Sequence, residues 1–300
     1  MSSSPPAVPT PDPGPPADAP DGAAAADKPK GTDWWGEIKG IFWLVLAVLA
    51  FHSFVAKPFY IPSESMMPAL LTGDRLVVTK YPYGWSWVSP SFHVLPRWHG
   101  RLFGRLPERG DIVILTPPDR TSDLIKRVIA LPGDTVEMVD GTLYLNGRAV
   151  KRVARPPVRI PIDANSPCDG NLVAHQVSGP DGHLYCELPV YRETLPNGRS
   201  YDTIDLGLTD LDNFSKVTIP AGRVWVMGDN RDNSADSRVP ISEEGLGGPI
   251  PWENIGGRAE FITFSLDGTS SWINPLSWFT ALRGGRAGTS LHPAREGASR

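Results

Sequence analysis

A single long apolar segment, from Gly40 to Ala56, limits how this 300-residue chain can be organised. It carries no charged side chain and reaches the lower end of the length that a helix needs to cross a bilayer, about 17 to 25 residues. Trp34 and Trp35 precede it, where tryptophans anchor helices at the membrane interface. A buried core helix would show the same pattern. A single transmembrane anchor is favoured, because the sequence before the segment is rich in Pro and Ala and the sequence after it is typical of a folded domain.

The flanking residues indicate how this anchor is oriented. Residues 1–32 are mainly Ser, Pro, Ala and Asp, and such a segment buries too little apolar surface to offset the entropy lost on ordering. We expect a disordered cytoplasmic tail there, followed by a signal-anchor helix over 33–56. Three lysines precede the apolar run and Lys57 follows it, which slightly favours a cytoplasmic N-terminus. The protein is then a single-pass protein of the plasma membrane, with the rest of the chain outside.

The sequence after the anchor predicts a mainly β structure. The chain contains 32 prolines, and short apolar runs alternate with turn residues. Residues 152–215 hold clusters of Pro, Asp, Asn and Gly and predict irregular structure. Strands are expected at 74–80, 109–115, 124–131, 217–227 and 250–265, with a hairpin of Thr135–Val139 and Thr142–Leu145 around Asp140-Gly141.

The segment from Phe59 to Pro68, FYIPSESMMP, is the most unusual part of this region. Pro62 and Pro68 restrict the backbone on either side of Ser63 and Ser65, so the segment is a stiff bend rather than a helix or a central strand. Apolar side chains surround the two serines and hold a hydroxyl in a rigid, apolar setting. A serine in such a loop is most often a turn residue, but a nucleophilic serine needs the same setting.

A serine nucleophile needs a base, and Lys126 is better placed for this role than the six histidines, which lie outside the serine loop and the other motif segments. On a strand, Lys126 shares one face with Leu124 and Val128, while Arg127 points to the opposite face. An amine kept among apolar groups can lose its proton near neutral pH and act as a base. The alternative is an edge-strand lysine that extends its amine to water.

Two further segments combine turn-forming and charged residues. Arg109-Gly110-Asp111 precedes an apolar strand, and the segment from Gly228 to Arg238 reads GDNRDNSADSR, which by itself is typical of a solvated turn. In their order along the chain, the serine loop, these two segments and the lysine strand resemble the conserved boxes of type I signal peptidases, also called leader peptidases. The resemblance covers the chain from the anchor to about Phe264 and rests on four separate motifs.

The resemblance implies a role for each matching residue. Ser65 corresponds to the nucleophile and Lys126 to the general base. Ser63 corresponds to a serine whose hydroxyl joins the backbone N–H of Ser65 in stabilising the negative charge of the transition state. Ser234 corresponds to a serine that hydrogen-bonds the lysine amine and orients it. The matching ion pairs are Arg127 with Asp229 and Asp236 with Arg238.

The resemblance also implies a domain plan and a substrate. It implies an antiparallel-sheet catalytic domain over 57–270 and a β-rich insertion without catalytic residues at about 135–225. The residues of 271–300 themselves predict an interfacial or disordered tail. The family removes signal peptides from exported preproteins after small residues, in an Ala-x-Ala pattern, so preprotein signal peptides and membrane lipid are the expected partners. Bulky residues at or beside the matching pocket positions leave room for little beyond a methyl group: Phe59, Ile61, Pro62, Met66, Leu70, Leu124 and Ile125. The family often has a small residue at the position of Glu64 and an aromatic one at the position of Leu124. These two departures affect the expected fine specificity for substrate, and not the expected reaction.

Other ligands are not indicated. Cys168 and Cys186 lie in the part expected outside the membrane, where a disulfide persists. His175 and His183 fall between them, but the spacing matches no compact zinc motif, and we expect neither a metal nor a cofactor. The net charge of −4 and the lack of a concentrated basic run argue against a nucleic-acid surface.

Several alternatives stay open at this point. The aromatic and arginine residues of 81–107 suit the lipid headgroup layer, or else a surface loop that turns its tryptophans inward. The apolar residues of 271–283 are too few to span and are at most interfacial. A second hypothesis is that the protein is another Ser–Lys processing peptidase. Self-cleaving repressors are one such class, but they are soluble and carry a DNA-binding domain. A non-catalytic, membrane-anchored surface protein that displays Arg109-Gly110-Asp111 is a third.

Overall fold

The computed structural model describes residues 14, 34–91, 96–119, 122–271 and 273–295. The chain divides into two compact units, one ending at Leu44 and the other running from Val45 to Arg300. Apart from Gly14, the first unit is described only where it contains the start of α1 (Trp34–Phe54). The tail expected over 1–32 otherwise lies outside the described residues.

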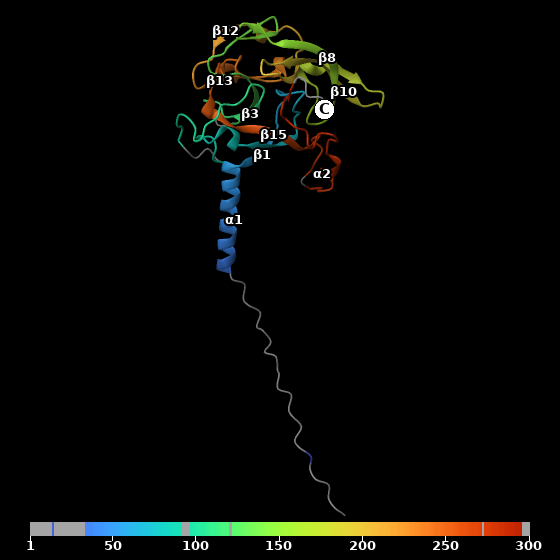
Figure 1. Cartoon of the computed structure of the whole chain (residues 1–300). Helices are drawn as coiled ribbons and strands as arrows, with labels where there is room; N and C mark the ends of the chain where they lie inside the picture. The colour runs from blue at the N-terminus through green and yellow to red at the C-terminus, as the bar shows by residue number, and fades with distance from the viewer. Residues whose placement is uncertain (1–13, 15–33, 92–95, 120–121, 272, 296–300) are drawn as a thin grey trace, which may run out of the picture. The chain divides into compact units, whose positions relative to one another are not determined.

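Helix α1 is the candidate membrane span. It is 21 residues long, unbroken (Figure 1), and long and apolar enough to cross a bilayer. Large apolar side chains occupy all its sides, and nearly all of them are exposed. A core helix of a soluble domain would bury one face, so the exposure favours the anchor over that alternative. The helix begins at Trp34, before the apolar run proper, and ends at Phe54.

In the described part of the chain, the second unit is built on a seven-stranded antiparallel sheet in the order β1-β2-β15-β3-β4-β13-β14. The mainly β, antiparallel fold expected from the sequence is confirmed. The strands are β1 (Ala56–Tyr60), β2 (Asp74–Thr79), β3 (Ile112–Leu115), β4 (Leu124–Ala130), β13 (Arg223–Met227), β14 (Ile250–Pro251) and β15 (Ile255–Ser265).

The central strands β3 and β4 are buried on both faces, which explains why their sequences read as nearly continuous apolar runs. Ile112 and Ile114 join one hydrophobic cluster, whereas Val113 and Leu115 join another on the opposite face. Adjacent residues of β4 therefore face two different environments. This alternation separates Lys126 from its neighbour Arg127.

Over the described residues, the chain between β4 and β13 forms two smaller antiparallel sheets, one of which is extended by β16 from the C-terminal segment. One has four strands in the order β12-β5-β6-β7, and the other has five, β16-β11-β10-β8 with β9 paired to β10. The expected hairpin around Asp140-Gly141 is confirmed as β5 and β6. The bounds are β5 (Thr135–Val139), β6 (Thr142–Leu145), β7 (Arg148–Ala149), β8 (Lys151–Pro161), β9 (Gln176–Ser178), β10 (Leu184–Thr194), β11 (Arg199–Ile204), β12 (Phe214–Thr218) and β16 (Ala294–Arg295).

The expectation of irregular structure over 152–215 is wrong. Strands β8 and β10 are each 11 residues long and pair along almost their whole length. Strand β8 lacks the usual strand signals because it is a largely exposed edge strand that contains Pro156 and Pro157. Proline is tolerated at an edge, where its missing N–H does not interrupt a ladder on both sides. The pairing with β10, which is distant in sequence, supplies the order that local composition does not.

The aromatic segment 81–107 divides its side chains between the interior and the surface. Tyr83 and Trp87 are buried, whereas Phe103 is 87% exposed. Arg101 donates one hydrogen bond of 2.7 Å to the backbone carbonyl of Gly84, in the same segment, and another of 2.7 Å to that of Ile255, in β15. These bonds tie the segment to the main sheet. Phe92 lies outside the described residues. Contact of the exposed remainder with lipid stays a prediction.

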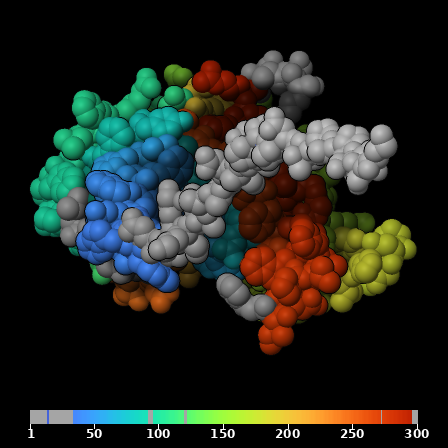
Figure 2. Space-filling model, turned by 90° about the horizontal axis from the view of Figure 1, so that it is seen from below, coloured from blue at the N-terminus to red at the C-terminus, as the bar shows by residue number. Residues whose placement is uncertain are grey.

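The C-terminal segment runs from the main sheet to the insertion. Ser290 forms an isolated bridge with Phe261 of β15, and β16 pairs with β11. Residues 273–282, within the orange-red part at the lower right of Figure 2, expose Ile273, Leu276 and Phe279. The remaining helical elements are short: α2 (Ser277–Thr280) and the 3₁₀ turns η1 (Tyr81–Tyr83), η2 (Gly170–His175), η3 (Asp210–Asp212), η4 (Arg231–Asn233), η5 (Ile241–Glu243) and η6 (Trp252–Asn254).

Candidate active site

Ser65 lies in the turn between β1 and β2, which local hydrogen bonds make rigid. The N–H of Gly73 donates to the carbonyl of Ile61, and the N–H of Leu70 donates to that of Met66, both at 2.9 Å. Met66 and Leu70 are wholly buried and anchor the turn in the hydrophobic core. Ser65 itself is only 7% exposed. The loop thus holds its hydroxyl in a nearly fixed position.

Lys126 comes from the middle of β4, 61 residues further along the chain. Its amine donates a hydrogen bond of 2.8 Å to the Ser65 hydroxyl, and 3% of the residue is exposed. Val128, on the same face of β4, belongs to an apolar cluster that Leu124 also contacts. Burial among such groups disfavours the charged form of an amine. The two groups therefore have the geometry that proton transfer from a serine to a lysine requires.

The segment after β13 packs against the backbone of Ser65. A Cβ added to Gly228 would lie 2.5 Å from the Ser65 carbonyl oxygen and 2.2 Å from the hydroxyl oxygen of Ser234, so only glycine fits. The N–H of Asn230 donates to the same Ser65 carbonyl at 3.1 Å. The buried Ser234 hydroxyl has no hydrogen-bond partner among the described residues. The expected bond from Ser234 to the amine of Lys126 is not formed here, although both side chains line one cleft.

Two buried ion pairs support this segment, and both are those that the sequence resemblance implies. Arg127 donates to the two carboxylate oxygens of Asp229 at 2.7 and 2.6 Å. Burial lowers the pKa of Arg127, but the Asp229 carboxylate outweighs this effect and raises it. Arg238 donates to Asp236 at 3.0 and 2.9 Å, and the N–H of Gly228 donates to the same carboxylate. Burial raises the pKa of Asp236, but Arg238 outweighs it, so this pKa lies below its usual value.

Ser65 and Lys126 open onto a cleft of about 750 Å³. Ser63 lies at its exposed side, with its hydroxyl oxygen 3.4 Å from that of Ser65. Among the described lining residues, Lys126 is the only basic one. Burial, and then the nearby carboxylate of Asp169, raises the pKa of Glu64. The cleft is strongly acidic, because five carboxylates line it: Glu64, Asp210, Asp232, Glu243 and Glu244.

The seven residues expected beside the substrate lie in four different environments. Leu124 lines the cleft, and Pro62 is exposed. Phe59 packs at the margin of the core. The other four, Ile61, Met66, Leu70 and Ile125, are buried in the hydrophobic cluster around the serine loop. Their burial shows that they support the loop, while contact with a substrate stays a prediction.

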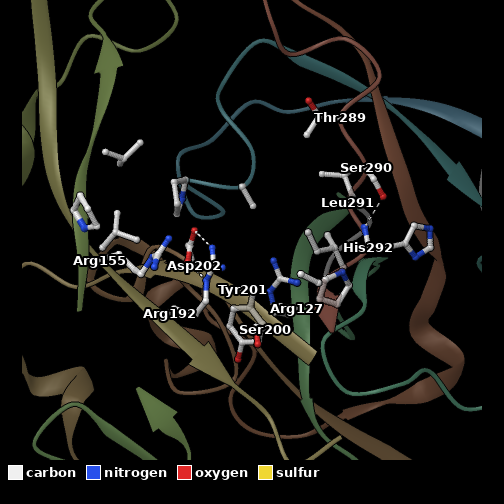
Figure 3. A pocket seen from close by; sticks show the side chains of 18 of the residues that line it. Arg127, Arg155, Arg192, Ser200, Tyr201, Asp202, Thr289, Ser290, Leu291 and His292 are labelled. Carbon is white, nitrogen blue, oxygen red and sulfur yellow. Dashed lines mark hydrogen bonds and ion pairs between the residues drawn. The ribbon is translucent and has the colours of Figure 1, made fainter. Parts of the chain in front are cut away.

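A second cavity, of about 520 Å³, lies where the insertion and the C-terminal segment meet the main sheet (Figure 3). Arg127 lines this cavity, whereas Lys126 lines the cleft, because neighbours on a strand point to opposite faces. Arg192 also lines it and is paired with Asp202 on the adjacent strand at 2.7 Å. Neither the serine nor the lysine of the cleft reaches it, so it is separate from the candidate active site.

The cysteines and histidines form no metal site in the described part of the chain. Cys168 and Cys186 are joined by a disulfide. No group of three or more His, Cys, Asp or Glu among the described residues is placed to hold a metal ion. His99 and His292 contact glutamates away from the cleft. His93 lies outside the described residues.

Arg109-Gly110-Asp111 is not displayed as a recognition tripeptide. Asp111 is 2% exposed and accepts hydrogen bonds from Tyr83 at 2.7 Å and from Arg199 at 2.6 Å. These residues tie the start of β3 to the insertion, which is a structural use of the motif.

Sequence reasoning missed a buried network and a second buried lysine. The network consists of Arg231 with Glu193 and Tyr201, both of the insertion. The sequence does not single out Glu193, because strand β10 also carries Glu187 and Arg192. Lys80 is 4% exposed, donates to the backbone carbonyl of Ser89, and has a pKa lowered to about 8, chiefly by burial and then by Lys57. Its amine meets a carbonyl rather than a hydroxyl, so it lacks the geometry of a general base.

Comparison with known proteins identifies the family. The family described as "Signal peptidase, peptidase S26" matches residues 34–264. The chain belongs to this family. Signal peptidase I of Rickettsia typhi (strain ATCC VR-144 / Wilmington) is 35% identical over 238 residues, covering 76% of this chain and 80% of that protein. The Rickettsia prowazekii (strain Madrid E) enzyme is 36% identical with the same coverage.

A solved structure of signal peptidase I from Enterococcus faecalis V583 also matches, at 24% identity. It covers 51% of this chain and 97% of the other, with a TM-score of 0.27. A likeness with so low a TM-score supports no conclusion about the fold, which is defined by the strand pairing described above. As an S26 signal peptidase the chain is a hydrolase of peptide bonds, which excludes a non-catalytic surface protein.

Proposed function

We propose that this protein is a membrane-anchored serine endopeptidase that removes N-terminal signal peptides from exported preproteins, cutting after small residues in an Ala-x-Ala pattern. Ser65 acts as the nucleophile and Lys126 as the general base. One observation carries the proposal: the 2.8 Å hydrogen bond between the lysine amine and the serine hydroxyl, on residues that are 3% and 7% exposed.

The reaction proceeds in two halves. The neutral Lys126 amine takes the hydroxyl proton while Ser65 Oγ bonds to the carbonyl carbon of the scissile peptide. The Ser63 hydroxyl and the Ser65 N–H stabilise the resulting oxyanion. The C–N bond then breaks, the lysine gives its proton to the leaving amine, and the signal peptide remains as an ester on Ser65. Water, deprotonated by the same amine, hydrolyses the ester and restores both groups.

The neighbouring residues support these roles. The Ser63 hydroxyl lies beside that of Ser65, on the exposed side of the loop at the cleft. The Ser234 hydroxyl is buried at the same cleft without a described hydrogen-bond partner. It can therefore hold the lysine amine once the amine has released the serine hydroxyl. The ion pairs of Arg127 and Arg238 fix the backbone on which these groups depend.

Specificity for small residues follows from the packing next to Ser65. Leu124 stands at the cleft, and Ile61 and Ile125 belong to the hydrophobic cluster that holds the serine loop in place. A substrate side chain larger than a methyl group would have to displace these groups, and each methylene of misfit costs about 1–3 kcal/mol. Replacing the alanine before the cut by leucine should therefore reduce kcat/KM by at least tenfold.

Membrane anchoring completes the proposed function. Helix α1 spans the plasma membrane once, with its N-terminus in the cytoplasm, the domain 57–270 outside, and lipid as a partner. The length and apolar surface of α1 and the excess of lysines before it support this topology. An anchored active site gains effective concentration toward cleavage sites just beyond a transmembrane segment. The insertion at about 135–225 contributes no group to the chemistry itself.

The experiment compares two buried lysines in the detergent-solubilised full-length protein. Ser65→Ala and Lys126→Met should abolish cleavage of a preprotein, as followed by mass spectrometry of the products. Lys80→Met is the matched control: it removes an equally buried amine that contacts no hydroxyl, and should retain cleavage. Normal cleavage by Lys126→Met, or a cut that does not follow a small residue, would refute the proposal.

A further inference from the structure

The insertion reaches the active-site segment through a fully buried ion pair. Arg231, in the turn η4 after Gly228, donates to both carboxylate oxygens of Glu193 on β10, each at 2.6 Å. The side chains of Arg231 and Glu193 are 2% and 1% exposed. A two-pronged pair with this geometry orients both partners, since both donors and both acceptors must align.

A second residue of the insertion encloses this pair. Tyr201 of β11 lies directly opposite Glu193 in the strand register, and its hydroxyl donates to Glu193 at 3.0 Å. The ring of Tyr201 also stacks on Arg127, whose guanidinium carbon lies 4.2 Å from the ring centroid. Glu193 therefore contacts Arg231, and Tyr201 contacts Arg127, so the insertion reaches both of the arginines near Asp229.

The charges explain why Glu193 is needed. Arg127, Arg231, Asp229 and Glu193 form a neutral, buried set. Burial lowers the pKa of Arg231, but the Glu193 carboxylate, with smaller effects of Tyr201 and Asp229, raises it above its ordinary value. Without Glu193, the Arg231 guanidinium would be left to compete with Arg127 for the single carboxylate of Asp229. The Arg127–Asp229 pair would then lose its present geometry.

A short chain of contacts connects this set to the nucleophile. Arg231 also donates to the carbonyl of Gly228 at 3.2 Å. Gly228 packs against the Ser65 carbonyl, and the N–H of Asn230 donates to it. A displaced Arg231 would therefore move the peptide groups that hold Ser65.

We propose that Glu193 is a positioning residue for peptide hydrolysis: it acts through Arg231 and Gly228 to hold the Ser65 hydroxyl in line with the Lys126 amine. Glu193 and Tyr201 of the insertion thereby take part in catalysis without lining the cleft. This inference rests on the proposed Ser–Lys mechanism. It assigns the effect to kcat rather than to KM, because substrate binds at the cleft while the network lies behind the nucleophile.

The test compares three variants of the full-length enzyme in detergent, using a preprotein or a peptide with an Ala-x-Ala site. Glu193→Gln keeps the shape but removes the charge, and should lower kcat about tenfold with KM within twofold of wild type. Glu193→Asp keeps the charge and should recover part of the loss. Glu187→Gln is the matched control: it makes the same change on the same strand, in an exposed pair with Arg159, and should match wild type.

The rates are scaled to the folded fraction, measured by tryptophan fluorescence. An unchanged kcat in Glu193→Gln, a loss no greater than the unfolded fraction, or an equal loss in Glu187→Gln would overturn the inference. If Glu193→Gln does not fold, Tyr201→Phe decides, since it removes only the hydroxyl bonded to Glu193. A reduced kcat at constant KM supports positioning, and wild-type kinetics overturn it. Ser65→Ala in the same assay tests the proposed mechanism separately, because its full activity would refute the mechanism whatever Glu193 does.

Discussion

Replacing Lys80 by methionine should remove a pH dependence from the stability of the β-rich unit. Lys80 follows β2, is 4% exposed, and donates from its amine to the backbone carbonyl of Ser89. Burial, and then repulsion from Lys57, lowers its pKa from 10.5 to about 8. Between these two values the unfolded chain binds a proton that the folded chain does not, so stability rises with pH across this window.

The magnitude follows from the shift. One pKa unit corresponds to about 1.4 kcal/mol, so a lysine with a folded pKa of about 8 and an unfolded pKa of 10.5 costs about 3 kcal/mol at pH 7. At pH 10 most of this cost is gone, and about 1 kcal/mol remains. From pH 7 to pH 10, the free energy of unfolding of the wild type should therefore rise by about 2 kcal/mol relative to that of the Lys80→Met variant. Tyr83 and Tyr201, whose pKa values burial raises, titrate alike in both proteins and cancel in the difference.

The assay is urea unfolding in detergent, followed by tryptophan fluorescence at pH 7, 8, 9 and 10. Lys216→Met serves as the control, because Lys216 is largely exposed and should leave the pH dependence unchanged. A difference between wild type and Lys80→Met that stays constant to within about 0.5 kcal/mol across this range would refute the reasoning. Such a result would mean that the amine keeps its proton on folding. The pH profile of cleavage by Lys80→Met should match wild type, since Lys80 does not line the cleft.

Three further predictions concern the ion pair, the disulfide and the cleft. Asp229→Ala should lower the free energy of unfolding by about 3–5 kcal/mol, because it leaves the buried Arg127 without its carboxylate; a loss below about 1 kcal/mol in urea unfolding would contradict this. Reduction of Cys168–Cys186, which closes a loop with a sequence separation of 18, should cost about 3 kcal/mol, measured with and without reductant. Peptides with lysine just after the cut should be cleaved with higher kcat/KM than matched peptides with glutamate, because the cleft is lined by five carboxylates, and the difference should shrink as salt rises. Equal rates at low salt would argue that the carboxylates do not face the bound chain.

The parts of the site that could be predicted from sequence share one property: each is set by local chemistry. The prolines around Ser63 and Ser65 stiffen their loop wherever it lies, and the alternation along β4 puts Lys126 and Arg127 on opposite faces in any sheet. The apolar run of α1 likewise needs no partner to mark it as a candidate span. Residue type and spacing were enough for these features, and the family resemblance added the pairing of the segments.

The contacts between distant segments could not be predicted in this way. Strands β8 and β10 carry few local strand signals and are ordered by each other, and Glu193 is one glutamate among many until β10 brings it to Arg231.

The sequence by itself determined an anchor, a stiff serine loop and an apolar strand with one lysine, because hydrophobicity and backbone restriction act over a few residues. Only the tertiary structure decided that the amine of Lys126 meets the hydroxyl of Ser65, and that the insertion closes the charge network behind them. The physical reason is that hydrogen bonds and ion pairs depend on distances of about 3 Å, which strand pairing across the whole unit sets.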